Sequence, residues 1–212
     1  MNAIRTASPV LEELLLGDEP EAWRRLGFEV HPDGVCRVGA VRLRLAGSGV
    51  GEGVAGWSLS GIETTDLDGL PTAIAPTESA ESEPAAHPNG AAALDHVVAF
   101  TPDIARTLAA FAAAGIEPRR SGEIQSSQGP RQMAFFRLGE AVLELVQAPE
   151  PGPRSQPAAF WGLVVIVRDI DAAADQLGPL LGRIKDAVQP GRRIATIRPE
   201  AGLSAPLALM TA

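Results

Sequence analysis

Apolar residues recur with two alternating periods in the stretch 93–147. An apolar run of strand length (94–100) is followed by a stretch with helical spacing (104–111). Further strand-like runs lie at 131–137 and 141–146. The pattern predicts one strand, one helix and then three strands, a βαβββ unit.

Similar patterns recur on both sides of this stretch. Residues 10–62 contain an apolar strand, a short helical stretch and three strand-like runs, and residues 159–212 repeat the order with Asp169 as a helix cap. We therefore predict three βαβββ units. Each unit has an apolar sheet face, which must pack against a neighbouring unit to be buried.

Composition marks the boundaries between these units. Residues 76–92 combine proline, alanine and acidic side chains, and residues 148–158 are rich in proline, so neither stretch has the apolar periodicity of a packed element. We expect both to be linkers. The predicted modules are then 1–75, 93–147 and 159–212.

Charge and cysteine content narrow the class of protein. The 212-residue chain has a net charge of -8 and a single cysteine. A nucleic acid or an anionic membrane would repel such a chain, and one thiol cannot form an intrachain disulfide. The sequence lacks an apolar run long enough to span a bilayer and lacks a signal-like N-terminus, so we expect a cytoplasmic protein.

The 93–147 unit resembles the vicinal oxygen chelate superfamily, which includes glyoxalase I, bleomycin-resistance proteins and extradiol dioxygenases. The resemblance rests on Leu94-Asp95-His96-Val97-Val98, on Thr101-Pro102-Asp103, and on Phe135 to Gly139 running into Val142 to Val146. It implies an α+β fold in which two βαβββ modules pair edge to edge and form a curved, mainly antiparallel sheet around a cleft. It also implies metal ligands on the first and last strand of each module, here His96 and Glu144.

The other two modules depart from this ligand pattern. In the third module the matching positions hold Gly162 and Ala208, neither of which can bind a metal. If the first and middle modules pair instead, the first strand contributes Glu12, or its neighbour Glu13. We expect the middle and third modules to pair, because the linker between them is short.

His96 and Glu144 offer an imidazole and a carboxylate, which suit a divalent metal such as Zn, Fe, Mn or Ni. A metal with vacant positions would bind two neighbouring oxygens of a substrate, and Glu144 is the candidate catalytic residue. The alternative is structural: His96 would bond a buried acceptor, and Glu144 would pair with an arginine. A buried Glu144 has to be paired, protonated or metal-bound in either case.

Other polar and aromatic residues are candidates for substrate contacts at the mouth of a cleft. Arginine forks bind carboxylates and phosphates, which favours an anionic or oxygen-rich ligand. The candidates are Arg131, Gln132, Trp161, Gln189 and Arg192. The alternative is that the polar ones are solvated loop residues and that Trp161 packs in the core.

The sequence is compatible with three functions. The first is a glyoxalase-like enzyme, a metal-dependent lyase, isomerase or dioxygenase acting on a small metabolite. The second is a non-catalytic small-molecule binding protein of the bleomycin-resistance type with a degenerate metal site. The third is a structural module with a filled cleft. Three modules leave one unpaired, most simply the first, which could pack on the outside of the two-module sheet or pair with its own copy in a homodimer. The apolar residues around Trp23 and Trp57 favour the homodimer.

Overall fold

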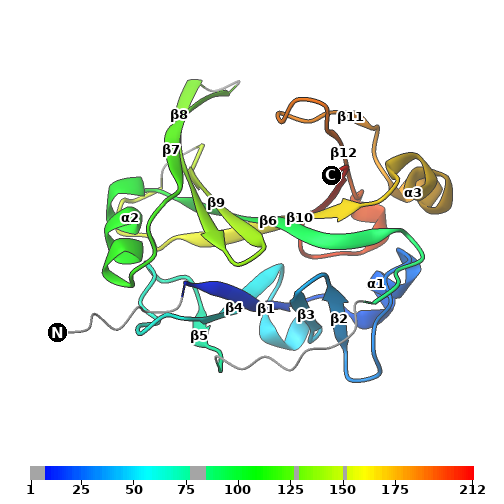
Figure 1. Cartoon of the computed structure of the whole chain (residues 1–212), viewed down its shortest axis with the longest axis horizontal. Helices are drawn as coiled ribbons and strands as arrows, with labels where there is room; N and C mark the ends of the chain where they lie inside the picture. The colour runs from blue at the N-terminus through cyan, green and yellow to red at the C-terminus, as the bar shows by residue number, and fades with distance from the viewer. Residues whose placement is uncertain (1–7, 77–84, 127–128, 150–151) are drawn as a thin grey trace.

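Two stacked β-sheets form the molecule (Figure 1). The computed structural model describes residues 8–76, 85–126, 129–149 and 152–212. The smaller sheet has the strand order β2-β3-β1-β4-β5, with β1 (Val10–Leu16), β2 (Val35–Val38), β3 (Val41–Leu45), β4 (Val54–Ser60) and β5 (Thr72–Ile74). The larger sheet has eight strands in the order β11-β12-β13-β10-β6-β9-β8-β7.

The larger sheet contains the middle and third βαβββ modules. The middle module consists of β6 (Ala91–Thr101), α2 (Ile104–Ala113), β7 (Arg120–Ser126), β8 (Gly129–Leu138) and β9 (Ala141–Gln147). The third module consists of β10 (Ala159–Val167), α3 (Ile170–Leu177), β11 (Lys185–Asp186), β12 (Arg193–Thr196) and β13 (Leu207–Met210). Over the described residues the pairings are antiparallel apart from β6 with β9 and β10 with β13. The predicted α+β class with a mainly antiparallel sheet is confirmed.

Aspartates begin the two longer helices. Asp103 caps α2 by accepting from the backbone N–H of Arg106 at 3.1 Å, and Asp169 caps α3 by accepting from Asp171 at 2.9 Å. The remaining helical segments are short: α1 (Pro20–Arg25) and the 3₁₀ turns Ser48–Val50, Gly178–Leu180 and Pro199–Ala201.

The middle and third modules pair through β6 and β10, as the short linker between them predicts. The register of this pairing is symmetric: His96 lies opposite Val164, and Val98 lies opposite Gly162. A local twofold axis that relates the two modules therefore superposes His96 on Gly162. This confirms the sequence alignment of the two modules.

The first unit differs from the predicted βαβββ module in its last strand. In the middle module, the last strand β9 runs parallel to the first strand β6. In the first unit, the strand parallel to β1 is β3, whereas β4 is antiparallel to β1, as β10 is to β6. The five-stranded sheet thus has the topology of the central strands β8-β9-β6-β10-β13 of the larger sheet.

A repeated glycine supports this equivalence. A Cβ at Gly56 on β4 would lie 3.0 Å from the carbonyl oxygen of Pro71, and a Cβ at Gly162 on β10 would lie 2.4 Å from that of Pro206. Each proline precedes the strand that runs parallel to the glycine's strand. The first unit is therefore a reduced copy of the pair of modules that follows it.

The first unit packs on the outer side of the larger sheet, and the main core lies between the two sheets. The ring of Trp57 from the smaller sheet contacts Phe160 and Phe111 at centroid distances of 5.0 and 6.4 Å, and Phe111 contacts Phe136 at 4.7 Å. Trp23 and Trp57, which suggested a dimer surface, are buried inside the chain. The reason for expecting a homodimer is therefore removed.

The linker expected over residues 76–92 is only partly a linker. Residues 77–84 lie outside the described residues, whereas Ala91 and Ala92 already belong to β6. Between them, His87 is buried and accepts from the backbone N–H of Glu29 at 2.9 Å, and Asn89 donates to the carbonyl of Leu26 at 2.8 Å. Residues 85–90 are therefore docked onto the first unit.

Among the residues that the structure describes, no helix is both long enough and apolar enough to cross a bilayer.

Candidate functional site on the concave face of the larger sheet

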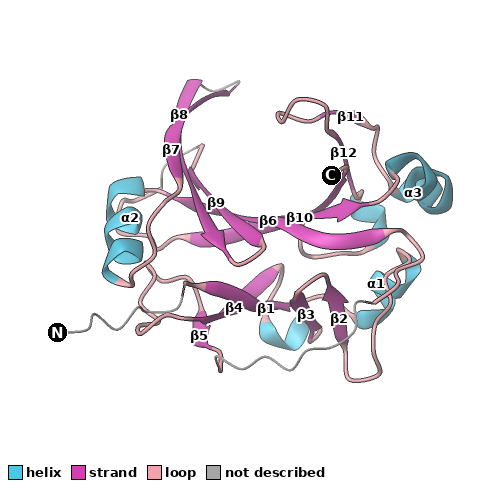
Figure 2. Cartoon of the chain, viewed as in Figure 1, coloured by secondary structure: helices cyan, strands magenta, loops and turns pink. Residues whose placement is uncertain are grey.

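The larger sheet curls, so that β7–β8 at one end and β11–β12 at the other rise on the side away from the smaller sheet (Figure 2). We call this side the concave face. The side chains of Leu94 and Val97 on β6 point away from the concave face and into the main core. Between them the pairing with β10 shifts register, since Val164 pairs with His96 but Val165 pairs with Leu94. This bulge at Asp95 allows Asp95 and His96, although adjacent in sequence, to interact with each other.

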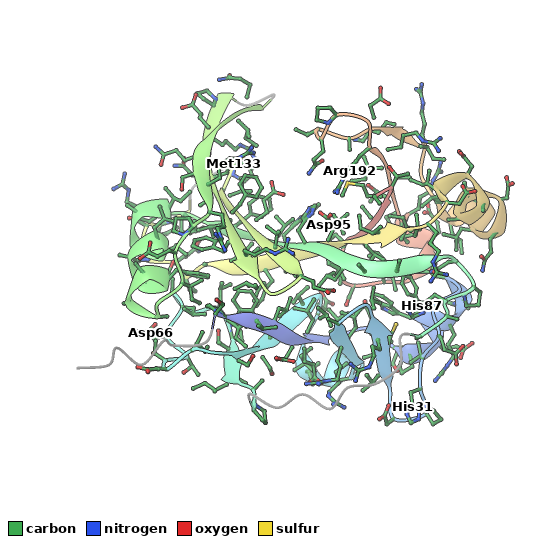
Figure 3. The ribbon with its side chains drawn as sticks, viewed as in Figure 1. His31, Asp66, His87, Asp95, Met133 and Arg192 are labelled. Carbon is green, nitrogen blue, oxygen red and sulfur yellow. The ribbon has the colours of Figure 1, made fainter. Side chains whose placement is uncertain are left out.

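Four charged or titratable side chains form a line on the concave face. Arg192 Nη1 donates to Asp95 Oδ1 at 2.9 Å, and His96 Nδ1 donates to Asp95 Oδ2 at 2.6 Å. His96 Nε2 then lies 3.5 Å from Glu144 Oε2. Asp95 and Arg192 are labelled in Figure 3, where they lie between the two raised ends of the sheet.

The environment of Asp95 fixes the tautomer of His96. Burial by itself raises the pKa of Asp95, but hydrogen bonds from His96 and Arg192 outweigh it and hold this pKa below the usual range. An ionised carboxylate only accepts hydrogen bonds, so Nδ1 of His96 carries a proton. In the neutral imidazole, Nε2 is then an acceptor that faces Glu144.

Glu144 lies in an apolar environment. Across the sheet it pairs with Val98 on β6 and Phe135 on β8, and Val142 and Val146 precede and follow it on the same face of its own strand. Burial raises the pKa of Glu144, and Asp95 adds to this effect, while His96 acts in the opposite direction. The proton of Glu144 is therefore held more tightly than that of an ordinary glutamate.

Two apolar clusters flank this polar line. The first contains Val98, Met133 and Val146, with Phe100, Ile124 and Phe135 packed against it; the second contains Val164, Ala208 and Met210, with Ile166, Ala187 and Ile194 packed against it. Both are separate from the main core, which lies on the other side of the sheet. The concave face thus combines a polar centre with apolar sides.

The structure brings together three of the residues selected from the sequence. His96, Glu144 and Arg192 lie in the polar line. Arg192 is bound to Asp95, which the sequence analysis did not select. The signal for Asp95 was its place beside His96, but ordinary strand alternation would have put it on the opposite face.

Two of the remaining candidates lie on or near the concave face. Trp161 is 49% exposed and contacts Phe100 edge to face at 5.9 Å, so it lies beside the first apolar cluster and not in the core. Arg131 is on the same side of β8 as Met133, two residues nearer to the β7–β8 turn.

The expected substrate contacts of Gln132 and Gln189 are not supported by their positions. Gln132 alternates with Met133 on β8, so its exposed side chain points away from the concave face. Gln189 lies in the exposed turn between β11 and β12, where its backbone carbonyl accepts from the N–H of Arg192.

The first unit does not bring Glu12 to His96 and Glu144. Glu12 is on β1 of the smaller sheet, and its carboxylate accepts a hydrogen bond from Ser60 at 2.8 Å. A register shift at Glu12 matches the one at Asp95, so Glu13, and not Glu12, is equivalent to His96. Glu13 is bound by Arg42 and Arg44 at 3.2 and 3.0 Å.

The residues present do not fit the four-ligand metal site that the family resemblance implies. Glu144 lies opposite Val98 on β6, and the equivalent pair in the third module is Val164 and Ala208, so Ala208 replaces a carboxylate. At Gly162, which is equivalent to His96, the backbone of Pro206 leaves no space for a side chain. Among the described residues, no three His, Cys, Asp or Glu side chains are grouped as metal ligands.

Comparison with known families gives one match. Residues 93–193 match the model of the Glyoxalase/Bleomycin resistance protein/Dioxygenase superfamily. The matched segment includes all four members of the polar line. A comparison with curated proteins found no match.

Solved structures share the fold at low sequence identity. A mutant of 4-hydroxymandelate synthase from Streptomyces coelicolor superposes with a TM-score of 0.61 at 16% identity, covering 97% of this chain and 92% of that one. Methylmalonyl-CoA epimerase from Mycobacterium tuberculosis gives a TM-score of 0.47 at 17% identity, covering 60% of this chain and 92% of that one. The first of these shows that the whole described architecture, including the first unit, is a known arrangement.

Proposed function

Because residues 93–193 belong to the glyoxalase/bleomycin resistance protein/dioxygenase superfamily, we propose that this chain binds a small molecule on the concave face of its larger sheet. The observation that carries the proposal is the polar line between two apolar clusters on that face. Binding sites for small molecules commonly combine apolar walls with a few placed polar groups. His96 and Glu144 would contact the polar group of the ligand, and the clusters would contact its apolar part.

The proposed binding does not depend on a metal at the positions implied by the family. Only the middle module supplies ligand-type side chains, whereas Gly162 and Ala208 of the third module supply none. This donor set favours a binding protein with a degenerate metal site over a metal-dependent lyase or dioxygenase.

The three tryptophans provide a direct test. Trp23 and Trp57 are buried and donate to Asp18 and Thr72, whereas Trp161 is exposed beside the first apolar cluster. In protein labelled with ¹⁵N at tryptophan, a library of small compounds with an apolar body and one polar group should contain members that shift the indole signal of Trp161. The signals of Trp23 and Trp57 should not move, and EDTA should leave the shifts unchanged.

Matched variants locate the binding. Phe135→Ala removes part of the apolar wall beside Glu144 and should weaken binding about tenfold, because a buried aromatic contact is lost. Ile74→Ala removes an exposed apolar side chain from the smaller sheet and should leave binding unchanged. A library in which no compound shifts Trp161, or shifts that vanish on removal of metal, would contradict the proposal.

A second candidate, acid–base catalysis, is favoured by the line from Asp95 through His96 to Glu144. An oriented imidazole next to a carboxylate with a raised pKa is an arrangement that transfers protons. Incorporation of deuterium from solvent into a bound ligand, lost in His96→Gln while binding persists, would distinguish catalysis from binding alone.

A further inference from the structure

The fixed charges at the centre of the concave face are unbalanced. Asp95 and Glu144 are both carboxylates, and the one guanidinium in the polar line, that of Arg192, is bound to Asp95. Glu144 is therefore the carboxylate of the polar line that has no guanidinium partner among the described residues. The same face also holds Arg131 and Arg120, whose guanidinium lies over the ring of Phe135 at 4.9 Å, so the imbalance is local to the polar line.

The carboxylate of Glu144 has room for a further partner. Among the described residues its ion-pair partner is His96, and their 3.5 Å separation exceeds the 2.7–2.9 Å usual for a charge-assisted hydrogen bond. The side chain is 22% exposed, so one side of it remains accessible. A half-buried carboxylate with apolar neighbours gains most from a cationic donor, since water there solvates it incompletely.

Among the described residues, the arginines of β7 and β8 do not ion-pair with Glu144, and Arg137 donates to the carbonyl of Gly139. Arg120 on β7 lies over the ring of Phe135 at 4.9 Å, on the strand beyond the one that faces Glu144. Arg131 lies four residues along β8 from Phe135, near the turn. The charged groups that act on Glu144 are instead His96 and Asp95.

Aromatic rings lie beside this carboxylate. Phe135 is directly opposite it, and Phe100, which contacts Trp161, is two residues beyond Val98 on the neighbouring strand. Aromatic faces attract cations as well as apolar groups, and Phe135 already binds a guanidinium in this way. A ligand with a cationic group and an apolar or aromatic body would match both features.

We propose that the ligand is an organic cation, a protonated amine or amidinium on an apolar body, whose cationic group binds Glu144 and whose body lies against Phe135, Phe100 and Trp161. This inference rests on the proposed function and specifies the class of ligand. The sequence had instead led us to expect an anionic ligand bound by residues such as Arg192 and Gln132. Arg192 is ion-paired with Asp95, and the side chain of Gln132 points away from the concave face.

Three probes that share one body and differ in charge test the inference. Phenylbutylamine, phenylbutanol and phenylbutyrate present a cation, a neutral hydroxyl and an anion at neutral pH. Binding is measured by calorimetry and by the indole signal of Trp161. We expect the amine to bind about tenfold more tightly than the alcohol, since a hydrogen bond to a charged group contributes more than a neutral one. The carboxylate should bind most weakly.

Two variants separate the local charge from the negative field of the whole chain. Glu144→Gln keeps the shape of the side chain and should remove the advantage of the amine over the alcohol. Glu140→Gln makes the same charge change on the exposed β8–β9 turn and should preserve that advantage.

The outcomes distinguish the two proposals. If the alcohol shifts Trp161 as strongly as the amine in both wild type and Glu144→Gln, binding on the concave face stands and the cationic class is overturned. Tighter binding of phenylbutyrate than of phenylbutylamine would likewise overturn the cationic class while leaving binding on the concave face in place. If none of the probes shifts Trp161, the cationic class is overturned for this body, and the library experiment alone decides the proposed function.

Discussion

At the scale of single residues, the candidate site depends on the environment of Glu144. This carboxylate is placed between Val98 and Phe135, so burial dominates its protonation and raises its pKa. Asp95, on the other side of His96 in the polar line, has a lowered pKa because the hydrogen bonds from His96 and Arg192 outweigh the effect of burial. The pKa values of two carboxylates on one face are therefore shifted in opposite directions.

The raised pKa of Glu144 predicts a pH-dependent stability. A carboxyl group whose pKa is higher in the folded state stabilises the fold below its ordinary value of 4.5, and this contribution is lost as the pH rises through the folded value. The free energy of unfolding of the wild type should thus fall relative to that of Glu144→Gln as the pH rises from 4.5 through the raised pKa of Glu144. Urea titrations at several pH values measure this difference. The exposed Glu140→Gln is the control, and equal pH dependence in the two variants would contradict the argument.

At the scale of elements, the two modules of the larger sheet have diverged on β10 and β13. Pro206 lies so close to Gly162 that its carbonyl oxygen takes the space of a Cβ, and the backbone N–H of Leu163 donates to it at 2.9 Å. The same contact occurs between Gly56 and Pro71 in the first unit. The glycine is therefore required by strand packing at two equivalent places, which explains why no metal ligand occurs there.

This packing predicts the effect of substitution at Gly162. Gly162→Ala forces a Cβ within 2.4 Å of a backbone oxygen, so the strands must shift, and we expect a loss of about 2 kcal/mol or more in the free energy of unfolding. Gly122→Ala on β7 is the matched control, because open space surrounds that position. Urea unfolding compares the two variants. Equal stability of both would show that the close approach of Pro206 does not constrain the sheet.

At the scale of the whole molecule, buried polar side chains join the first unit to the modules that follow. Asp18 accepts hydrogen bonds from the indole of Trp23 at 3.0 Å and from the hydroxyl of Ser204 at 2.7 Å, so it connects the first unit to the third module. Asp68, in the left-handed region at φ 55°, binds Arg106 on α2 at 2.6 Å. Because these contacts and the shared core connect the three units, we expect them to unfold as one cooperative body.

Asp18 provides a test of this coupling. Asp18→Ala leaves the indole N–H of Trp23 without its partner in the core, and we expect the free energy of unfolding to fall by about 2–4 kcal/mol. Glu200→Ala removes an exposed carboxylate and should change stability little. Unfolding followed by far-ultraviolet circular dichroism and by tryptophan fluorescence should remain a single coincident transition. Two separate transitions would show that the units unfold independently.

The sequence by itself determined the local elements and the likeness of the middle and third modules. Hydrophobic periods and helix caps are set by neighbouring residues, so β6, α2 and β9 were found from their own patterns, as were His96 and Glu144. The sequence also showed that Gly162 and Ala208 cannot be metal ligands, because this depends on residue identity alone.

Tertiary structure decided the properties that depend on pairing between distant strands. The bulge at Asp95 and the ion pair with Arg192, 97 residues away, made a polar line from residues with no pattern of their own. Pairing of β4 with β1 showed that the first unit is a reduced two-module sheet, and it separated Glu12 from the candidate site. Register and long-range ion pairs depend on which strands meet, and local sequence does not contain that information.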